Sequence, residues 1–186
     1  MLNNNILMYT VKKHLEKKIQ KDVFFIEMDF KIAPKHFINK IEEGINEDSN
    51  MSYQTNVKGE MTAWNYFCED TDFLILAKMA MNYLDQNIYV SRCQLKEAWG
   101  IKTSLNQYTK KHNHYAAVLS GILYLNKSDQ KTIFPELDIE VTPAVGKVIL
   151  FHSSLYHFTK PSTDLKPKYA IPFNYFEIKL WQNNKI

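Results

Sequence analysis

The spacing of apolar residues divides the chain into two parts of different character. Up to about residue 87, apolar side chains recur at three- and four-residue intervals, which is the period of a helix with one buried face. This pattern predicts helices over residues 4–20, 34–46 and about 71–86, with one short apolar strand, 23–30, between the first two.

Beyond residue 87 the pattern changes to short runs rich in β-branched and aromatic residues, separated by Asn, Ser, Asp, Pro and Gly. These runs predict strands over residues 88–90, 98–105, 116–126, 132–134, 139–142, 145–151 and 169–178. Short strands at this spacing are typical of antiparallel sandwiches and barrels. We therefore expect a mainly β protein with an α flank. A helical N-terminal layer, residues 1–87, would pack on a double-stranded β-helix (a cupin-like jelly roll) over about 88–182, and residues 1–186 would form a single domain.

Composition narrows the function without defining it. With 186 residues, 45% of them hydrophobic, the chain is long enough to bury a real core. A net charge of +3 is too small to indicate nucleic-acid binding. The two cysteines lie far apart, no secretory leader is recognisable, and no apolar run approaches the roughly 18 residues of a membrane span. We expect a soluble cytoplasmic protein (in the host cytoplasm if a phage encodes it) without a membrane partner.

Candidate chemistry begins with two histidines separated by one residue. In an extended segment the side chains of His112 and His114 share a face, and His157 could reach the same point from a neighbouring strand. Imidazole suits divalent iron, copper, nickel and zinc. His152 is a rival ligand, but it directly follows a strand, whereas His157 is better placed to begin the next extended segment. The simpler interpretation is a set of solvated loop histidines.

Two further strands add polar residues on the same side. If the period of two continues from His114, Ser120 and Tyr124 share its face and predict a polar pocket. In the last strand, Lys168 and Asn174 share a face. An inward lysine is unfavourable unless it is paired, and a carboxylate ligand would pair it. The alternative is a solvated lysine in a lysine-rich chain.

These residues occur in an order that resembles a known family. Between about residues 95 and 176 the chain carries His112-x-His114, Ser120-Gly121-x-x-Tyr124, Pro143-x-x-Gly146, His157 and Lys168. This order is similar to that of small phage and bacterial 2-oxoglutarate- and Fe(II)-dependent oxygenases, and more distantly to that of the prolyl 4-hydroxylases.

The resemblance implies a specific site. Fe(II) would be bound by His112, His114 and His157, and 2-oxoglutarate would chelate the metal while Lys168 holds its distal carboxylate. Ser120, Tyr124 and Asn174 would supply further co-substrate contacts. The enzyme would be a non-haem dioxygenase that uses O₂ and couples decarboxylation of the keto acid to hydroxylation of a small molecule or peptide.

Two departures from the family pattern leave alternatives open. His114 stands where the prolyl hydroxylases have Asp, so either three histidines bind the metal or two bind it and a water replaces the third. Ala170 stands where many relatives place a serine that contacts the co-substrate. A cupin-like three-histidine enzyme without a keto acid, and a non-enzymatic jelly-roll binding or structural module, are the competing functions. A homodimer through an edge strand or the helical flank is compatible with either.

Overall fold

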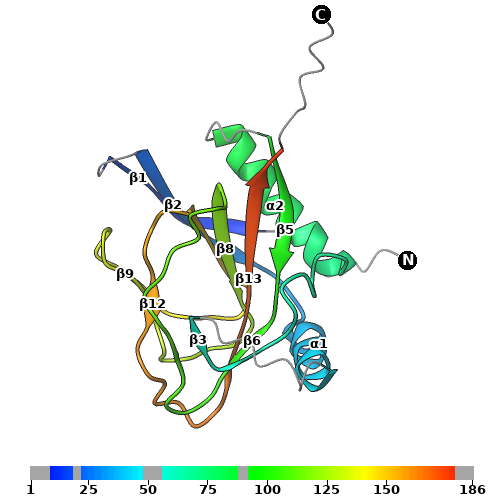
Figure 1. Cartoon of the computed structure of the whole chain (residues 1–186). Helices are drawn as coiled ribbons and strands as arrows, with labels where there is room; N and C mark the ends of the chain where they lie inside the picture. Colours follow the sequence, from blue (N-terminus) through cyan, green and yellow to red (C-terminus); the bar gives the residue numbers. More distant parts are fainter. Residues whose placement is uncertain (1–8, 19–21, 48–55, 88–91, 179–186) are drawn as a thin grey trace, which may run out of the picture.

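A computed structural model describes residues 9–18, 22–47, 56–87 and 92–178 and shows a mainly β chain with two helices (Figure 1). The helices are α1 (Pro34–Glu47) and α2 (Thr71–Asn87). The strands are β1 (Tyr9–Lys18), β2 (Asp22–Phe30), β3 (Val57–Lys58), β4 (Glu60–Met61), β5 (Cys93–Ala98), β6 (Ile101–Thr103), β7 (Tyr108–Thr109), β8 (Leu119–Tyr124), β9 (Thr132–Phe134), β10 (Ile139–Val141), β11 (Lys147–His152), β12 (Phe158–Thr159) and β13 (Lys168–Glu177).

The strands form one large sheet and two small ones. The large sheet has the order β1-β2-β11-β8-β13-β6-β4, with β5 also paired to β13. A three-stranded sheet, β10-β9-β12, lies opposite β8 and β13, and β3 pairs with β7 (Figure 1). Neighbouring strands run antiparallel throughout these pairings. Strands far apart in the sequence thus meet around one interior.

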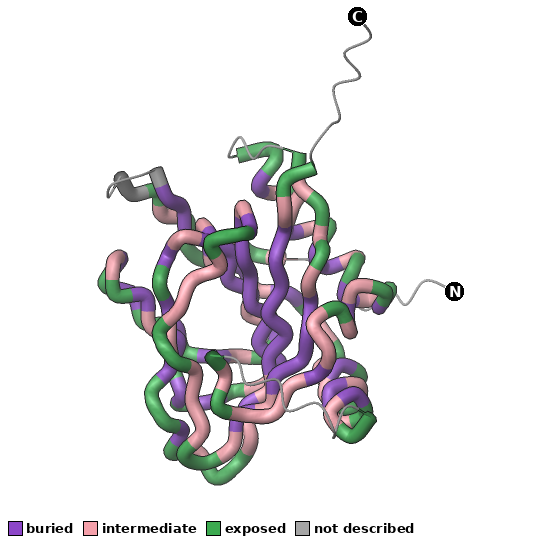
Figure 2. The backbone as a smooth tube through the Cα atoms, in the orientation of Figure 1, coloured by how far each residue is buried: buried purple, intermediate pink, exposed green. Residues whose placement is uncertain are grey.

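Alternation along the central strands separates two cores. On one face of β8, Leu123 belongs to a hydrophobic cluster with Phe73 and Leu76 of α2. On the other face, Ile122 and Tyr124 belong to a second cluster between the large and the three-stranded sheets. β8 is buried throughout and β13 along most of its length (Figure 2). Because the helices cover the outer face, the inner face is left to form a site.

The helix predicted over residues 4–20 is wrong within its described part, because Tyr9–Lys18 forms strand β1. The pairing of β1 with β2 shifts register between Val11 and Lys13. Val11 packs against the first cluster and Leu15 against the second, so the irregularity moves later apolar residues to the opposite face. Val11 and Leu15 are four residues apart, which is also the spacing of apolar residues on one face of a helix.

The other predicted elements agree with the structure more closely. The helices predicted over 34–46 and 71–86 and the strand over 23–30 are confirmed. The strand predicted over 98–105 is interrupted at Trp99 and Gly100 and belongs to β5 and β6. The strand predicted over 88–90 lies outside the described residues. The N-terminal layer is therefore two helices plus β1 and β2, which join the large sheet.

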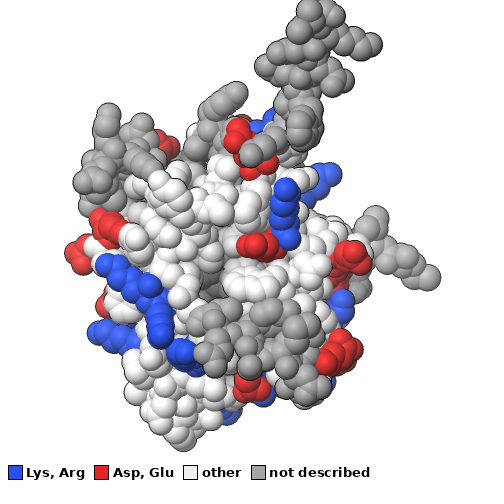
Figure 3. Space-filling model, viewed as in Figure 1, with Lys and Arg blue, Asp and Glu red and all other residues white. Residues whose placement is uncertain are grey.

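The surface carries both signs of charge. On the face shown in Figure 3, Lys and Arg residues lie in groups at the left and at the upper right, with acidic residues nearby, and neither sign covers the whole face. Neither α1 nor α2 is long and apolar enough to cross a membrane.

Candidate metal centre and anion pocket

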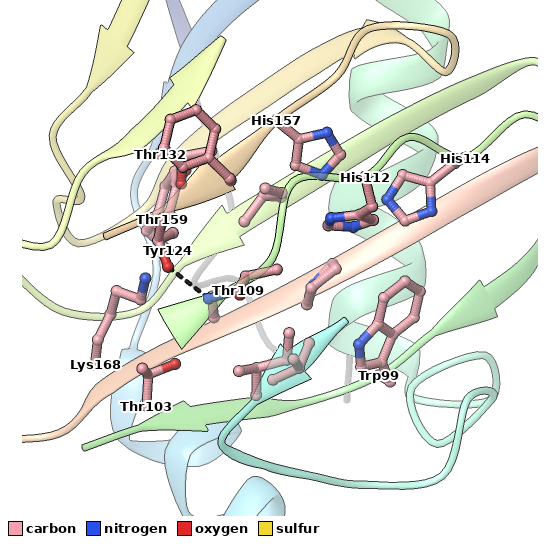
Figure 4. Close-up of a pocket in the computed structure, with 16 residues that line it drawn as sticks. Trp99, Thr103, Thr109, His112, His114, Tyr124, Thr132, His157, Thr159 and Lys168 are labelled. Carbon is pink, nitrogen blue, oxygen red and sulfur yellow. Dashed lines mark hydrogen bonds between the residues drawn. The ribbon is translucent and has the colours of Figure 1, made fainter. Parts of the chain in front are cut away.

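The three predicted histidines converge at one end of a cavity between the sheets (Figure 4). One ring nitrogen from each of His112, His114 and His157 lies within 4.8 Å of the others. The ring centroids are 4.3 Å apart for His112 and His157, 5.0 Å for His112 and His114, and 5.2 Å for His114 and His157. This spacing allows one ion to contact all three rings.

Backbone pairing holds the two loops that carry these histidines. The His112 amide donates to the His157 carbonyl at 3.1 Å, and the His157 amide donates back at 2.9 Å. The His114 amide donates to the Ser153 carbonyl at 2.9 Å. The loop between β7 and β8 is thus joined directly to the turn after β11. Backbone hydrogen bonds therefore help to bring the three histidine rings together.

The rings of His112 and His157 are oriented by backbone carbonyls. His112 Nδ1 lies 2.8 Å from the Lys110 carbonyl, and His157 Nδ1 lies 3.2 Å from the Leu155 carbonyl. Because a carbonyl oxygen only accepts, both Nδ1 atoms carry the proton. Each Nε2 then has a free lone pair, which is the form that binds a metal ion.

The ring of His114 is supported by a side chain instead. The Asn174 Nδ2 lies 3.3 Å from His114 Nδ1 and donates to Glu97 Oε2 at 2.6 Å, while Ser120 Oγ donates to Asn174 Oδ1 at 2.7 Å. Ser120 and Asn174 are only 1% and 2% exposed. The structure therefore places these two residues beside the histidine end of the cavity.

Burial sets the charge of the histidines. Desolvation lowers the pKa of all three rings, to about 3 for His114 and well below the ordinary value for His157. The charge of His112 lowers the pKa of both other rings further. At neutral pH the three rings are therefore uncharged, which fits a divalent cation.

At the other end of the cavity, Lys168 extends its amino group inward from the start of β13 (Figure 4). Lys168 is 5% exposed, and desolvation lowers its pKa to about 8, although the charge of Asp164 acts in the opposite direction. Within the described ranges its amino group forms no hydrogen bond or ion pair. A buried and unpaired ammonium group is unfavourable, so this end of the cavity suits an anion.

Hydroxyl groups line the wall near Lys168. The Tyr124 hydroxyl donates to Thr132 Oγ1 at 2.7 Å, and the Thr109 amide donates to Thr159 Oγ1 at 2.8 Å. Thr103 is buried and is the register partner of Lys168. Tyr124 was predicted from the sequence, whereas Thr103, Thr132 and Thr159 were not. The period of two through Trp99, Ile101 and Thr103 was the available signal for Thr103.

Ser120 and Asn174 lie far from this anion pocket. Asn174 is six residues along β13 from Lys168, about 20 Å at roughly 3.3 Å per residue. Ser120 is the register partner of Asn174 on β8. Sharing a face with Lys168 is therefore not sufficient for sharing its ligand, because a long strand spans both ends of the cavity.

Trp99, in the segment between β5 and β6, also lines the cavity. It is 3% exposed, its ring lies 4.6 Å from that of Trp64, and 6.2 Å from that of His114. Its Nε1 is buried without a hydrogen-bond partner in the part of the chain that is described.

The rival ligand His152 is outside the histidine cluster, and its Nδ1 lies 2.8 Å from Ser154 Oγ.

Comparisons with known proteins identify the fold. No protein-family model and no curated protein sequence matches the chain. Among solved structures, the viral collagen prolyl hydroxylase vCPH from Paramecium Bursaria Chlorella virus-1, in complex with 2OG, has a TM-score of 0.67 and 15% identity and covers 83% of this chain and 96% of its own.

Two further structures show the same similarity. HygX from Streptomyces hygroscopicus, with nickel and 2-oxoglutarate bound, has a TM-score of 0.58 and 11% identity and covers 82% of both chains. A prolyl hydroxylase from Trichoplax adhaerens, in complex with a hypoxia inducible factor peptide fragment, has a TM-score of 0.57 and 13% identity and also covers 82% of both chains. The fold is thus the double-stranded β-helix of these oxygenases, which confirms the fold expected from the sequence.

Proposed function

We propose that the protein is a 2-oxoglutarate- and Fe(II)-dependent oxygenase that hydroxylates its substrate. The observation that carries this proposal is that one end of the cavity suits a cation and the other end suits an anion. Three neutral imidazoles at one end suit a cation, and a buried, unpaired Lys168 at the other end suits an anion. A keto acid that chelates a metal ion through one end and carries a distal carboxylate satisfies both.

In this proposal the chain's own residues have separate tasks. His112, His114 and His157 hold Fe(II), and Lys168 pairs with the distal carboxylate of 2-oxoglutarate. Tyr124 contributes a buried hydroxyl to the same wall. When bound, Fe(II) and 2-oxoglutarate supply O₂ activation coupled to loss of CO₂ from the keto acid. The protein supplies position, a dry cavity and a matched charge.

The third histidine changes the charge of the site. A carboxylate ligand would cancel part of the metal's charge, whereas His114 is neutral because burial lowers its pKa to about 3. A neutral third ligand would leave the full divalent charge of a bound metal ion to attract the anionic keto acid. The His114 ring lies close enough to the other two rings to share an ion with them. This position supports a three-histidine site over one in which a water molecule replaces the third ligand.

The substrate end is the Trp99 side of the cavity. Apolar residues such as Ile122, Pro172 and Val57 line the cavity along with Trp99. The solved peptide complex of the Trichoplax prolyl hydroxylase shows that this fold can present its site to a peptide. We propose a peptide side chain or a small molecule with an apolar reacting part as the substrate, and Trp99 Nε1 as a donor towards it.

An anaerobic titration tests the function directly. Fe(II) is added to the protein under nitrogen, followed by 2-oxoglutarate, and the visible spectrum is recorded. The proposal predicts a weak charge-transfer band that appears only when protein, Fe(II) and 2-oxoglutarate are all present. Absence of the band together with absence of keto-acid binding by calorimetry would refute it.

A second candidate function is a three-histidine dioxygenase that needs no keto acid. The observation that favours it is the absence of a carboxylate among the three converging residues. The two candidates differ in oxygen consumption. Uptake of O₂ that requires 2-oxoglutarate supports the first function, and uptake that is independent of 2-oxoglutarate supports the second.

A further inference from the structure

The three histidines differ in what faces their Nδ1 atoms. Carbonyl oxygens face Nδ1 of His112 and His157, so these rings carry their proton at Nδ1. His114 Nδ1 instead faces the Asn174 amide group. Since a metal-binding Nε2 requires the proton at Nδ1, the group that faces Nδ1 decides whether each ring is ready for an ion.

The Glu97 carboxylate assigns the orientation of the Asn174 amide. Glu97 and Ser120 are its register partners on β5 and β8, so the three side chains form one row across the sheet. The Glu97 carboxylate can only accept, and it lies 2.6 Å from the Asn174 Nδ2. The Ser120 hydroxyl donates to the Oδ1 on the opposite side at 2.7 Å. Because a hydroxyl can donate or accept, the Ser120 contact fits either orientation, and the Glu97 carboxylate decides between them.

This orientation directs an N–H group of Asn174 towards His114 Nδ1, at 3.3 Å. Nδ1 then accepts, and the proton of the neutral ring resides on Nε2. For Nε2 to bind an ion, that proton must leave and another must occupy Nδ1, with no change in the ring's charge. The Asn174 amide must turn over, so that Oδ1 accepts from Nδ1 and Nδ2 donates to Ser120 Oγ.

We propose that Glu97 is a positioning residue that controls the metal-binding readiness of His114 through Asn174. In the turned orientation Oδ1 would face the Glu97 carboxylate, acceptor against acceptor. Glu97 therefore favours the form of His114 that does not bind an ion at Nε2. This inference rests on the proposed metal site but not on the keto acid or on turnover.

Nitrogen-15 NMR of the metal-free protein tests the first half of the inference. Two-bond correlations between ring protons and ring nitrogens show which nitrogen of a neutral histidine carries the proton, and the His114→Ala spectrum identifies the His114 signals. We expect the Nε2–H form for His114 and the Nδ1–H form for His112 and His157, which serve as internal controls. The Nδ1–H form at His114 in the wild-type protein would overturn the inference.

Metal affinity tests the second half, with Co(II) as the probe and calorimetry as the readout. In Glu97→Gln the side-chain amide can donate to the turned Asn174 Oδ1, so Co(II) should bind about three- to tenfold more tightly. Simple attraction predicts the opposite, because the substitution removes a negative charge near the cation. An unchanged or weaker Co(II) affinity would overturn the inference.

Two further variants establish that the effect passes through Asn174. In an Asn174→Leu background, Glu97→Gln should no longer tighten Co(II) binding. Glu177→Gln changes an exposed carboxylate farther along the same strand pair and should leave the affinity unchanged. Loss of keto-acid binding with the expected tautomers intact would count against the oxygenase function alone, so the two failures are distinguishable.

Discussion

Burial acts on the side chains at both ends of the cavity, and the two ends respond in different ways. Desolvation lowers the pKa of the histidines at one end and of Lys168 at the other. Imidazole begins near pKa 6.5, so the lowered value leaves a neutral ring with a lone pair. Lysine begins near 10.5, so a value of about 8 still leaves a cation at neutral pH. Basic residues alone thus give one cavity an uncharged end that suits a cation and a positively charged end that suits an anion.

The two ends of the cavity also differ in the backbone contacts that position their side chains. The histidines lie on loops whose backbones bond to each other, between His112 and His157 and between His114 and Ser153. Lys168 is part of the large sheet, in register with Thr103. A substitution at one end should therefore leave the ligand of the other end bound, and this separation can be tested.

The largest effect should come from removing a histidine. His157→Ala deletes a buried ligand, so Co(II) affinity should fall by more than about 100-fold, measured by calorimetry. His152→Ala is the matched control, because His152 is the last residue of β11, the strand that precedes His157, but lies outside the cluster. Equal Co(II) affinity in a folded His157→Ala variant would show that this ring is not a ligand.

The next effect should come from reversing the charge at the opposite end. Lys168→Glu places a carboxylate against the distal carboxylate of 2-oxoglutarate, so keto-acid affinity should fall by about 100-fold or more while Co(II) binding persists. The exposed Lys166→Glu changes net charge equally and serves as the control. If Lys168→Glu retains wild-type keto-acid affinity, the anion pocket lies elsewhere.

A smaller and continuous effect should follow pH. Above its pKa of about 8 the Lys168 amino group loses its proton, and the keto acid then meets a neutral amine. Affinity for 2-oxoglutarate should fall as pH rises through this value, by up to about tenfold per unit, in calorimetric titrations between pH 7 and 9.5. The residual binding of Lys168→Met should show no such step, and a step that survives in this variant would have another origin.

The smallest effect should come from the wall between the two ends. Tyr124→Phe removes a hydroxyl that donates to Thr132, and its ring remains packed in the inner cluster. Keto-acid affinity should fall only about three- to tenfold, with Co(II) affinity unchanged. A larger loss of both would indicate that the hydroxyl supports the fold of the whole cavity.

The sequence was sufficient for the features that depend on local order. The two-residue spacing of His112 and His114, and the positions of His157 and Lys168 beside predicted strands, led to residues that the structure brings to one cavity. The double-stranded β-helix followed from the spacing of short strands. Side chains alternate between the two faces of a strand, and successive antiparallel strands lie next to each other. The pattern within each short segment therefore indicates which residues share a face.

The features that sequence analysis missed depend on register and irregularity. A bulge in β1 changes which face Leu15 occupies, so its spacing imitated a helix. Asn174 and Lys168 share a face, but the length of β13 separates their surroundings. Glu97 belongs to the site only because β5 pairs with β13 at Asn174. Such pairings between distant segments are not encoded in any single stretch of sequence.

A crystal structure with Mn(II) and N-oxalylglycine, an unreactive analogue of the keto acid, tests the central claim most directly. We predict anomalous density for one Mn(II) in contact with His112, His114 and His157, and a distal carboxylate paired with the Lys168 amino group. Mn(II) bound away from these rings, or an analogue whose distal carboxylate does not reach Lys168, would contradict the account.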